Sequence, residues 1–118
     1  MIIELNIADD TLGFVYENKI AQDGVNQVKA AIEKKLESHD KINIYLEEDD
    51  VDEIEIRAFI DHTFFDISYA KRINRLVIVS NRSWIRRVVR LKDLLMTSDV
   101  KAFSSKKRVD ALCWVMKK

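Results

Sequence analysis

The chain has 118 residues, of which 47% are hydrophobic and 34% charged, and its acidic and basic side chains are equal in number. This length is typical of one domain around one hydrophobic core, so we expect a single domain over residues 1–118. One cysteine, Cys113, excludes a disulfide within the chain and a multi-cysteine zinc site, and two glycines without any proline exclude a glycine-rich phosphate loop or a low-complexity linker.

Charge divides the chain into halves of opposite sign. Residues 1–59 hold 15 acidic and 6 basic side chains, a net charge of −9, and residues 60–118 hold 5 acidic and 14 basic, a net charge of +9. This polarity favours a basic face that meets an anionic surface, self-association by charge, or compensation between neighbouring elements.

The N-terminus carries no basic segment before a long apolar stretch, so no signal peptide is predicted. No apolar run approaches the roughly 20 residues that a membrane span needs. We therefore expect a cytoplasmic protein, with peripheral contact at the inner membrane face as an open alternative.

Strands and helices alternate in the first half of the chain. Residues 2–7 and 11–20 have the pattern of two strands joined by a turn at 8–10, which predicts an N-terminal hairpin. Asp23 is a predicted N-cap, and apolar residues follow at helical spacing to about residue 38: Val25, Val28, Ile32 and Leu36. A third strand is predicted at 42–46, and a helix from about residue 54 to 69.

The second half continues this alternation. Residues 76–80 are nearly all apolar, which is typical of a strand covered on both faces. Asn81 or Ser83 is expected to cap a helix that ends near residue 96, and 100–104 form the last predicted strand. Ser104 or Ser105 is expected to cap a final helix, whose apolar face would hold Val109, Leu112, Cys113 and Met116.

The predicted order of elements is ββαβαβαβα. Strands separated by single helices run parallel with right-handed crossovers. The sequence therefore predicts an α/β fold: a five-stranded, mostly parallel sheet with an antiparallel N-terminal hairpin strand, covered by four helices.

The C-terminal half contains RLVIVSNRSWIRRV and, further on, DVKAFSSKKRVDALCWV, and these stretches resemble the SpoIIAA-like family of STAS-type domains. The matching positions are Arg75, Val77, Val79, Asn81, Trp84, Val100, Phe103, Ala111 and Trp114. The stretch QDGVNQVKAAIEKKLESHDKINIYLE resembles the first helix and the following strand of that family.

The resemblance implies a small bacterial protein related to STAS and CRAL-TRIO folds, which binds an apolar ligand or lipid or acts as a regulatory interaction module. It implies no catalytic residue set and no cofactor, so no enzyme is expected. Anti-sigma-factor antagonists of the STAS class carry a phosphorylatable Ser or Thr after the third strand. Here no Ser or Thr lies between Asp40 and His62, which argues against a kinase-controlled switch.

The segment EEDDVDEIE, residues 47–55, holds seven acids in nine residues. It lacks the glycine and ligand spacing of a calcium loop. Asp50 or Asp52 could cap the next helix, and acids in its first turn would complement the helix dipole. The alternatives are a single carboxylate-bound cation, mimicry of a phosphate, and docking to a basic partner, which includes the second half of this chain. We expect the segment to form a loop before the helix, and the predicted docking residues of this loop are Glu47, Glu48, Asp49, Asp50, Asp52 and Glu53.

The helix NRSWIRRVVRLKDLLM has an apolar arc and a basic side. A basic amphipathic helix either covers a sheet with its arginines outward or lies on an anionic membrane. Lys92 falls inside the apolar arc, so its ammonium must reach past it or face an opening. The predicted anionic-surface contacts are Arg82, Arg86, Arg87, Arg90 and Lys92. The pI near 6.7 argues against a nucleic-acid partner.

Aromatic residues surround most of the helix that follows the acidic segment. Core packing, a homodimer contact and a ligand pocket are the alternatives for such a helix. The predicted pocket residues are Phe59, Phe64, Phe65, Tyr69 and Trp84. His39 is expected at a helix C-terminus and His62 on a helix surface, with no metal spacing between them. Cys113 is expected to be buried.

Overall fold

A computed structural model of the protein describes residues 2–96 and 98–117, without the side chains of Asp50 and Phe64. The described residues form five strands, four α-helices and two short 3₁₀ helices, η1 and η2. In chain order they are β1 (Ile2–Ala8), β2 (Thr11–Ile20), α1 (Gln22–Leu36), β3 (Ile42–Ile54), α2 (Ile56–Ser68), η1 (Ala70–Arg72), β4 (Ile73–Val79), α3 (Ser83–Leu95), β5 (Asp99–Phe103), η2 (Ser105–Lys107) and α4 (Arg108–Met116).

The described strands form one five-stranded sheet in the order β1-β2-β3-β4-β5. β1 pairs antiparallel with β2, and β2 to β5 pair parallel. The predicted fold class and order of elements are therefore confirmed.

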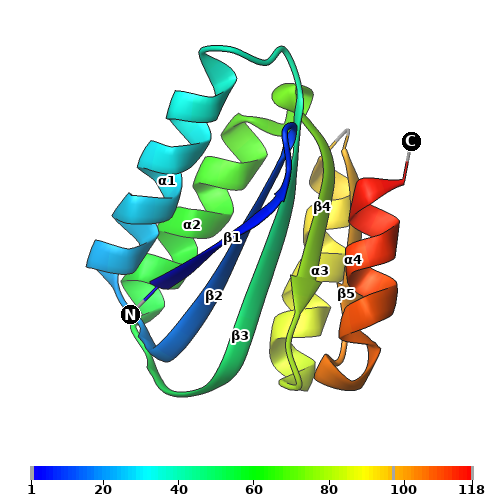
Figure 1. Ribbon diagram of the computed structural model, residues 1–118. Helices are drawn as coiled ribbons and strands as arrows, with labels where there is room; N and C mark the ends of the chain where they lie inside the picture. Colours follow the sequence, from blue (N-terminus) through cyan, green and yellow to red (C-terminus); the bar gives the residue numbers. More distant parts are fainter. Residues whose placement is uncertain (1, 97, 118) are drawn as a thin grey trace.

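The sheet has an unequal cover on its two faces (Figure 1). The three crossover helices α1, α2 and α3 pack on one face, where Ile44 and Leu46 of β3 point. α4 packs on the other face, where the intervening Tyr45 points. This alternation follows from the two-residue period of a strand, and because both faces are covered, the first part of β3 and the end of β4 are mostly apolar.

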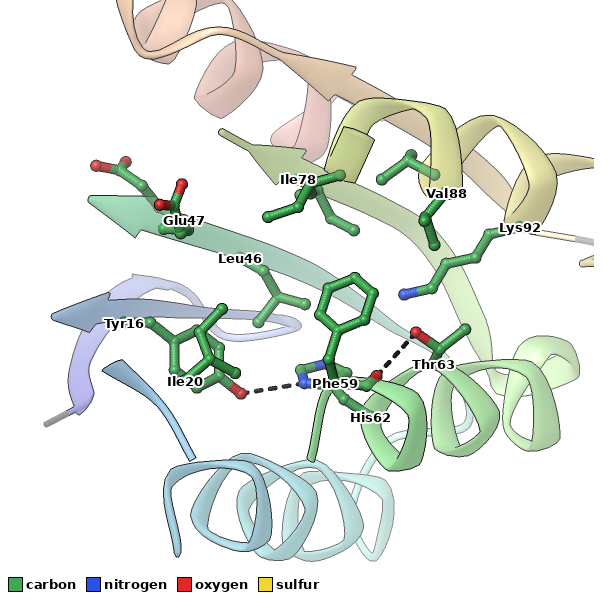
Figure 2. A pocket seen from close by; sticks show the side chains of 13 residues that line it. Tyr16, Ile20, Leu46, Glu47, Phe59, His62, Thr63, Ile78, Val88 and Lys92 are labelled. Atoms are coloured by element: carbon green, nitrogen blue, oxygen red, sulfur yellow. Dashed lines mark hydrogen bonds between the residues drawn. The ribbon is translucent and has the colours of Figure 1, made fainter. Parts of the chain in front are cut away.

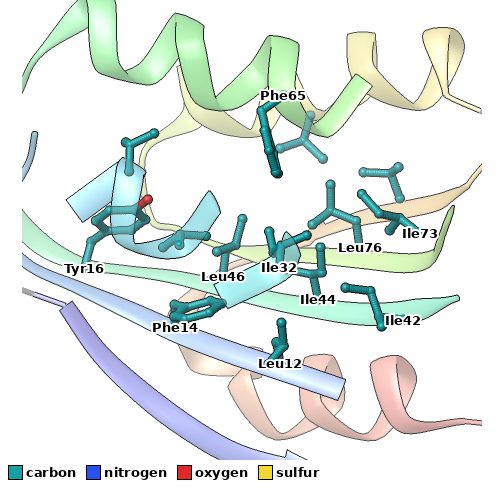
Figure 3. Close-up of a cluster of buried hydrophobic side chains, with 14 of the residues drawn as sticks. Leu12, Phe14, Tyr16, Ile32, Ile42, Ile44, Leu46, Phe65, Ile73 and Leu76 are labelled. Carbon is teal, nitrogen blue, oxygen red and sulfur yellow. The ribbon is translucent and has the colours of Figure 1, made fainter. Parts of the chain in front are cut away.

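The larger core lies under the crossover helices (Figure 3). It contains the predicted apolar face of α1, and its most deeply buried members include Phe14, Ile44 and Leu76. The smaller core lies under α4 and holds Tyr45, Val77, Val79, Ala111 and Val115.

The acidic segment is not a loop. β3 continues through it to Ile54 and stays paired with β2, with Glu17 opposite Asp49 and Lys19 opposite Glu53. Three residues of β3 lie opposite the single residue Asn18, whose φ of 67° is in the left-handed region that Asn tolerates. The strand therefore bulges at 50–52, inside the acidic segment.

Helix starts also differ from those predicted. α2 begins at Ile56 with Glu55 as its N-cap, so neither Asp50 nor Asp52 caps it. α1 has Ala21 at the N-cap, which places Asp23 in the first turn, where its charge still favours the helix. α3 has Arg82 at the N-cap, and within the described residues neither α3 nor α4 has a side-chain cap.

The predicted apolar face of α4 was wrong. Ala111 and Val115 face the sheet, whereas Val109, Cys113 and Met116 are exposed. The small Ala111 and Val115 let the helix approach Tyr45, and Leu112, the one member of the predicted face that is partly buried, packs at the edge of this core together with Trp114.

Candidate functional site

A pocket lies between α2, α3 and the sheet (Figure 2). Its volume is about 50 Å³, and its walls are almost entirely apolar. Side chains from all three layers line it, among them Tyr16, Leu46 and Ile78 from the sheet, Phe59, His62 and Thr63 from α2, and Ile85, Val88 and Lys92 from α3. The acidic side chains of Glu47 and Glu48 on β3 also belong to its lining.

The topology explains where this pocket is. In an open α/β sheet the carboxyl ends of the parallel strands are the usual place for ligands. Tyr16 and Ile78 lie toward these ends of β2 and β4, and α2 starts directly after β3. The first turns of α2 and the side of α3 therefore close over the ends of three strands.

The outer rim of the pocket is apolar and exposed. The ring of Phe59 packs edge-on against Trp84 of α3, with 5.2 Å between the ring centroids. Trp84 is 38% exposed, and further exposed apolar side chains lie on the same two helices, outside the pocket lining: Ile60 on α2, and Leu91 and Leu95 on α3. Large exposed apolar side chains on neighbouring helices are typical of a surface that meets another apolar group.

The inner wall of the pocket carries a buried polar network from β2, α2 and α3. The Tyr16 hydroxyl lies 3.0 Å from Nδ1 of His62, as Figure 2 shows. Asp66, one turn further along α2, has Oδ2 at 3.4 Å from His62 Nε2 and at 2.7 Å from Lys92 Nζ. Asp66 is 0% exposed, Lys92 4% and His62 7%, so the network is desolvated.

Burial sets the protonation of this network. Burial, together with the nearby Asp66 charge, raises the pKa of Tyr16, so its phenol stays protonated and donates to Nδ1 of His62. Burial lowers the pKa of His62, and the attraction of Asp66 does not overcome it because Lys92 opposes it. His62 is therefore neutral, and we assign its proton to Nε2 because Nδ1 faces the Tyr16 phenol and Nε2 faces the Asp66 carboxylate at 3.4 Å.

The sequence placed two members of this network wrongly. Lys92 was expected at an anionic surface and His62 on a helix surface, yet both are buried. The sequence signal for Lys92 was its place inside the apolar arc of α3. His62 and Asp66 lie four residues apart on the helix face that also buries Ala58. Their spacing alone does not indicate that this face is buried, so the sequence held no comparable signal for them.

Glu47 and Glu48, the first two acids of the acidic segment, form ion pairs with arginines from the basic half of the chain. Glu47 accepts two hydrogen bonds from Arg108, at 2.8 and 2.7 Å, and a further one from Tyr45. Burial raises the pKa of Glu47, but the bonds from Arg108 and Tyr45 outweigh it and hold the pKa below its ordinary value. Both charges are therefore present at neutral pH.

Glu48 makes an equivalent contact on the opposite face of the sheet. It accepts bonds from Ser80 Oγ at 2.9 Å, Arg82 Nε at 2.9 Å and the Val51 backbone N–H at 3.2 Å. Asp49, Asp52 and Glu53 are exposed, and the side chain of Asp50 lies outside the described residues. The acidic segment therefore has an internal part and an exposed part.

The predicted basic surface is also divided. Arg82 binds Glu48, Arg86 donates to the backbone oxygen of Ser80 at 3.1 Å, and Lys92 is buried against Asp66. Only Arg87 and Arg90 of the predicted set are exposed on α3.

The predicted aromatic pocket is brought together in part. Phe59 lines the pocket and Trp84 contacts Phe59 at its rim. Phe65 belongs to the larger core and packs against Tyr69. The Tyr69 hydroxyl donates to Glu33 of α1 at 3.1 Å, so Tyr69 is directed toward α1. The Phe64 side chain lies outside the described residues.

Two classes of site find no support in the part of the chain that the structure describes. Residues 2–96 and 98–117 contain no group of three or more His, Cys, Asp or Glu side chains placed to hold a metal ion. None of the described helices has the length and apolar character needed to cross a membrane.

Comparison with known proteins identifies the fold. A crystal structure of an uncharacterized protein of the DUF3478 family, with a SpoIIAA-like fold, from Shewanella loihica is similar, with a TM-score of 0.68 and 22% identity over 98% of this chain and 92% of that one. No curated protein matches the sequence. The family model described as SpoIIAA-like matches residues 11–116. The chain therefore belongs to the SpoIIAA-like family.

Proposed function

We propose that the protein is a binding module that takes an apolar or lipid-like ligand into the pocket between α2, α3 and the sheet. Membership of the SpoIIAA-like family supports a binding or regulatory module in general, and the family is generally non-catalytic. The observation that carries the proposal is the apolar pocket, with its exposed apolar rim, at the carboxyl ends of the parallel strands.

The size of the pocket sets a condition on binding. A volume of about 50 Å³ holds a few heavy atoms, whereas pockets for larger ligands reach roughly 300–1,000 Å³. α2 packs more extensively against α1 than against α3. Asp61 of α2 is tied to α1 by Gln22 at 2.9 Å and Lys29 at 3.0 Å. A long ligand therefore enters by widening the α2–α3 boundary.

Native mass spectrometry tests this proposal directly. The protein purified under mild conditions is expected to carry a small apolar molecule, or to take one up from a fatty-alcohol or fatty-acid mixture. Val88→Phe fills the pocket from α3 and should abolish uptake. Val109→Phe, on the exposed face of α4, is the matched control and should retain it. An unchanged uptake in Val88→Phe contradicts the proposal. The same spectra give the dimer fraction.

A second candidate function is peripheral contact with an anionic membrane. The exposed apolar stripe of α3 holds Trp84, Leu91 and Leu95, and Arg87 and Arg90 are exposed on the same helix. Apolar side chains beside arginines are the features of a helix that lies in a lipid interface. This surface adjoins the pocket mouth, which would let a ligand pass between membrane and protein.

Co-sedimentation with anionic and neutral liposomes at low salt tests the second candidate. We expect binding to anionic liposomes that is lost when Arg87→Glu is combined with Arg90→Glu, and weakened by Leu91→Asn. The same charge reversal at Arg57 on α2 is the control, and it should weaken binding to the anionic liposomes less. Wild-type protein that stays in the supernatant rules this candidate out.

A third candidate is a protein–protein module that docks a basic partner on Asp49, Asp52 and Glu53. This candidate is supported by the exposure of these three acids, whereas Glu47 and Glu48 are buried in ion pairs within the molecule. Replacing the three by Ser should remove a pulled-down partner without lowering thermal stability. An unchanged set of partners speaks against it.

A further inference from the structure

Two polar atoms of the buried network have no hydrogen-bond partner among the described residues: Nε2 of His62 and Oδ1 of Asp66. Both side chains are more than nine-tenths buried. A buried donor and acceptor left unsatisfied are costly, so native proteins seldom retain them without a use. His62 lines the pocket, and Asp66, which does not line it, contacts His62.

Lys92 adds unused donors to the same wall. Its ammonium has three N–H groups, of which one has a described acceptor, Oδ2 of Asp66. Figure 2 shows the Lys92 nitrogen extending across the pocket toward Phe59 and Thr63 of α2. The Thr63 hydroxyl donates to the Phe59 backbone oxygen at 3.0 Å, which leaves its own oxygen free to accept.

The network is electrically neutral as it stands. Asp66 and Lys92 form an ion pair at 2.7 Å, and Tyr16 and His62 are uncharged. Glu47 and Glu48, which also line the pocket, are paired with Arg108 and Arg82. A carboxylate in this pocket would add a second negative charge near Asp66, and an ammonium would add a second positive charge near Lys92. Either one leaves a buried charge without a counter-charge, which is strongly unfavourable.

We propose that the ligand of this pocket is an uncharged amphiphile whose polar end both donates and accepts hydrogen bonds, as a primary alcohol does. The inference rests on the proposed binding function. The hydroxyl oxygen accepts from Lys92 Nζ or His62 Nε2, and the hydroxyl proton goes to Thr63 Oγ1. The alkyl chain lies between Phe59, Ile85 and Val88 and leaves through the apolar rim.

Isothermal titration calorimetry with probes of equal chain length tests this selectivity. The probes are 1-octanol, octanoate and octylammonium, at about pH 8, where the carboxylate and the ammonium are both ionised. We expect 1-octanol to bind on the order of tenfold more tightly than either charged probe. Fluorescence of Trp84 in a Trp114→Phe background should report the same order, because Trp84 packs on Phe59 at the pocket mouth.

The outcomes separate the two claims. If octanoate or octylammonium binds as tightly as 1-octanol, the pocket stands as a binding site and the inference about its polar end is overturned. If no probe binds, the proposed function fails and the inference fails with it.

Charge variants sharpen the test. Asp66→Asn leaves Lys92 without a counter-charge and should move the preference to octanoate, whereas Lys92→Met should move it to octylammonium. Lys101→Met, exposed on β5, is the control and should keep the preference for 1-octanol. Circular dichroism checks that each variant folds. Folded variants that keep the wild-type order contradict the inference. Where a variant does not fold, the wild-type selectivity decides.

Discussion

At the scale of single residues, the ion pair of Lys92 and Asp66 is the least expected feature of the protein. Both side chains are almost fully buried, and the same carboxylate oxygen also faces His62. A buried ion pair seldom adds net stability over apolar residues of the same size, although removing one partner is strongly destabilising. The pair is therefore weak evidence for a stabilising role, and its place beside the pocket is what connects it with the ligand binding that we propose.

His62 should make the stability of the protein pH-dependent. Because its pKa is lower in the folded than in the unfolded chain, where it is near 6.5, the unfolded chain binds more protons below neutral pH. The free energy of unfolding should be highest above about pH 7.5 and should fall as the pH drops through the unfolded-state pKa of His62, by up to about 1.4 kcal/mol per pH unit. Urea unfolding at a series of pH values measures this slope.

Two histidine variants provide the control for that slope. The groups that face His62 are Asp66 and Asp61 on its own helix, Lys92 from α3, Lys29 from α1 and Tyr16 from β2. His62→Gln removes the imidazole, whose ordinary pKa lies near 6.5, and should flatten the slope, whereas His39→Gln keeps His62 and should retain its contribution to the slope. An equal slope in wild type and His62→Gln would show that the titrating group is another one.

The sequence indicated one residue of this site, but it did not show which of its polar side chains are buried. Lys92 was recognisable because a lysine within an apolar arc must have a special environment. His62 and Asp66 were not, because apolar residues surround most of α2 and the sequence does not tell which side meets the sheet. That information comes from the docking of α2 against α1 and β3, which is a tertiary property.

At the scale of elements, the acidic half of β3 shows how partners override local preference. Asp and Glu are depleted in strands, so the segment was predicted to be a loop and a helix start. It extends as a strand, in which consecutive residues face opposite sides of the sheet. Glu47 therefore meets Arg108 beside α4, and Glu48 meets Arg82 beside α3.

Arg108→Met should destabilise the protein through Glu47. The change leaves a buried carboxylate with only the hydrogen bond from Tyr45. Because the Arg108 side chain is 46% exposed, solvent already screens part of the pair. We expect the free energy of unfolding at neutral pH to fall by about 1–2 kcal/mol, measured by urea unfolding.

The matched control is Arg90→Met, which removes an exposed arginine from α3 and should change stability by less than about 0.5 kcal/mol. Adding Glu47→Gln to Arg108→Met removes the buried charge and should recover part of the loss. The same stability in Arg108→Met as in its control would mean that Glu47 does not depend on Arg108.

At the scale of the whole molecule, the two charge halves become two sides. Figure 1 shows β1, β2 and α1 on one side and α3, β5 and α4 on the other. The pairs Glu47–Arg108 and Glu48–Arg82 join the halves and neutralise two charges of each. Most of the separation of −9 and +9 remains. The two halves of the chain therefore neutralise each other's charge only in part.

This remaining separation should drive head-to-tail association at low ionic strength. Sedimentation velocity should give a larger average mass at about 0.01 M salt than at about 0.3 M, because the screening length shortens from about 30 Å to less than 10 Å. Arg87→Glu combined with Arg90→Glu reduces the positive side and should weaken the effect. A mass that does not depend on salt would show that the charge separation has no role in association.

The architecture was the most predictable property of this chain. Strands and helices of adequate length alternate, and the rules of parallel connection then leave one arrangement. The boundaries of β3 and the exposed face of α4 were not predictable, because Arg82 and Arg108 in one case and Tyr45 in the other come from distant parts of the chain.

The placement of α4 has a consequence for how the protein is made. The three crossover helices can dock on the sheet as the ribosome delivers them, but the opposite face waits for α4, which is synthesised after every strand. Until then Tyr45, Val77 and Val79 form an uncovered apolar strip on a nascent chain whose sheet is otherwise complete. The interval between the synthesis of β5 and that of α4 is therefore when this fold is most open to aggregation and to capture by chaperones.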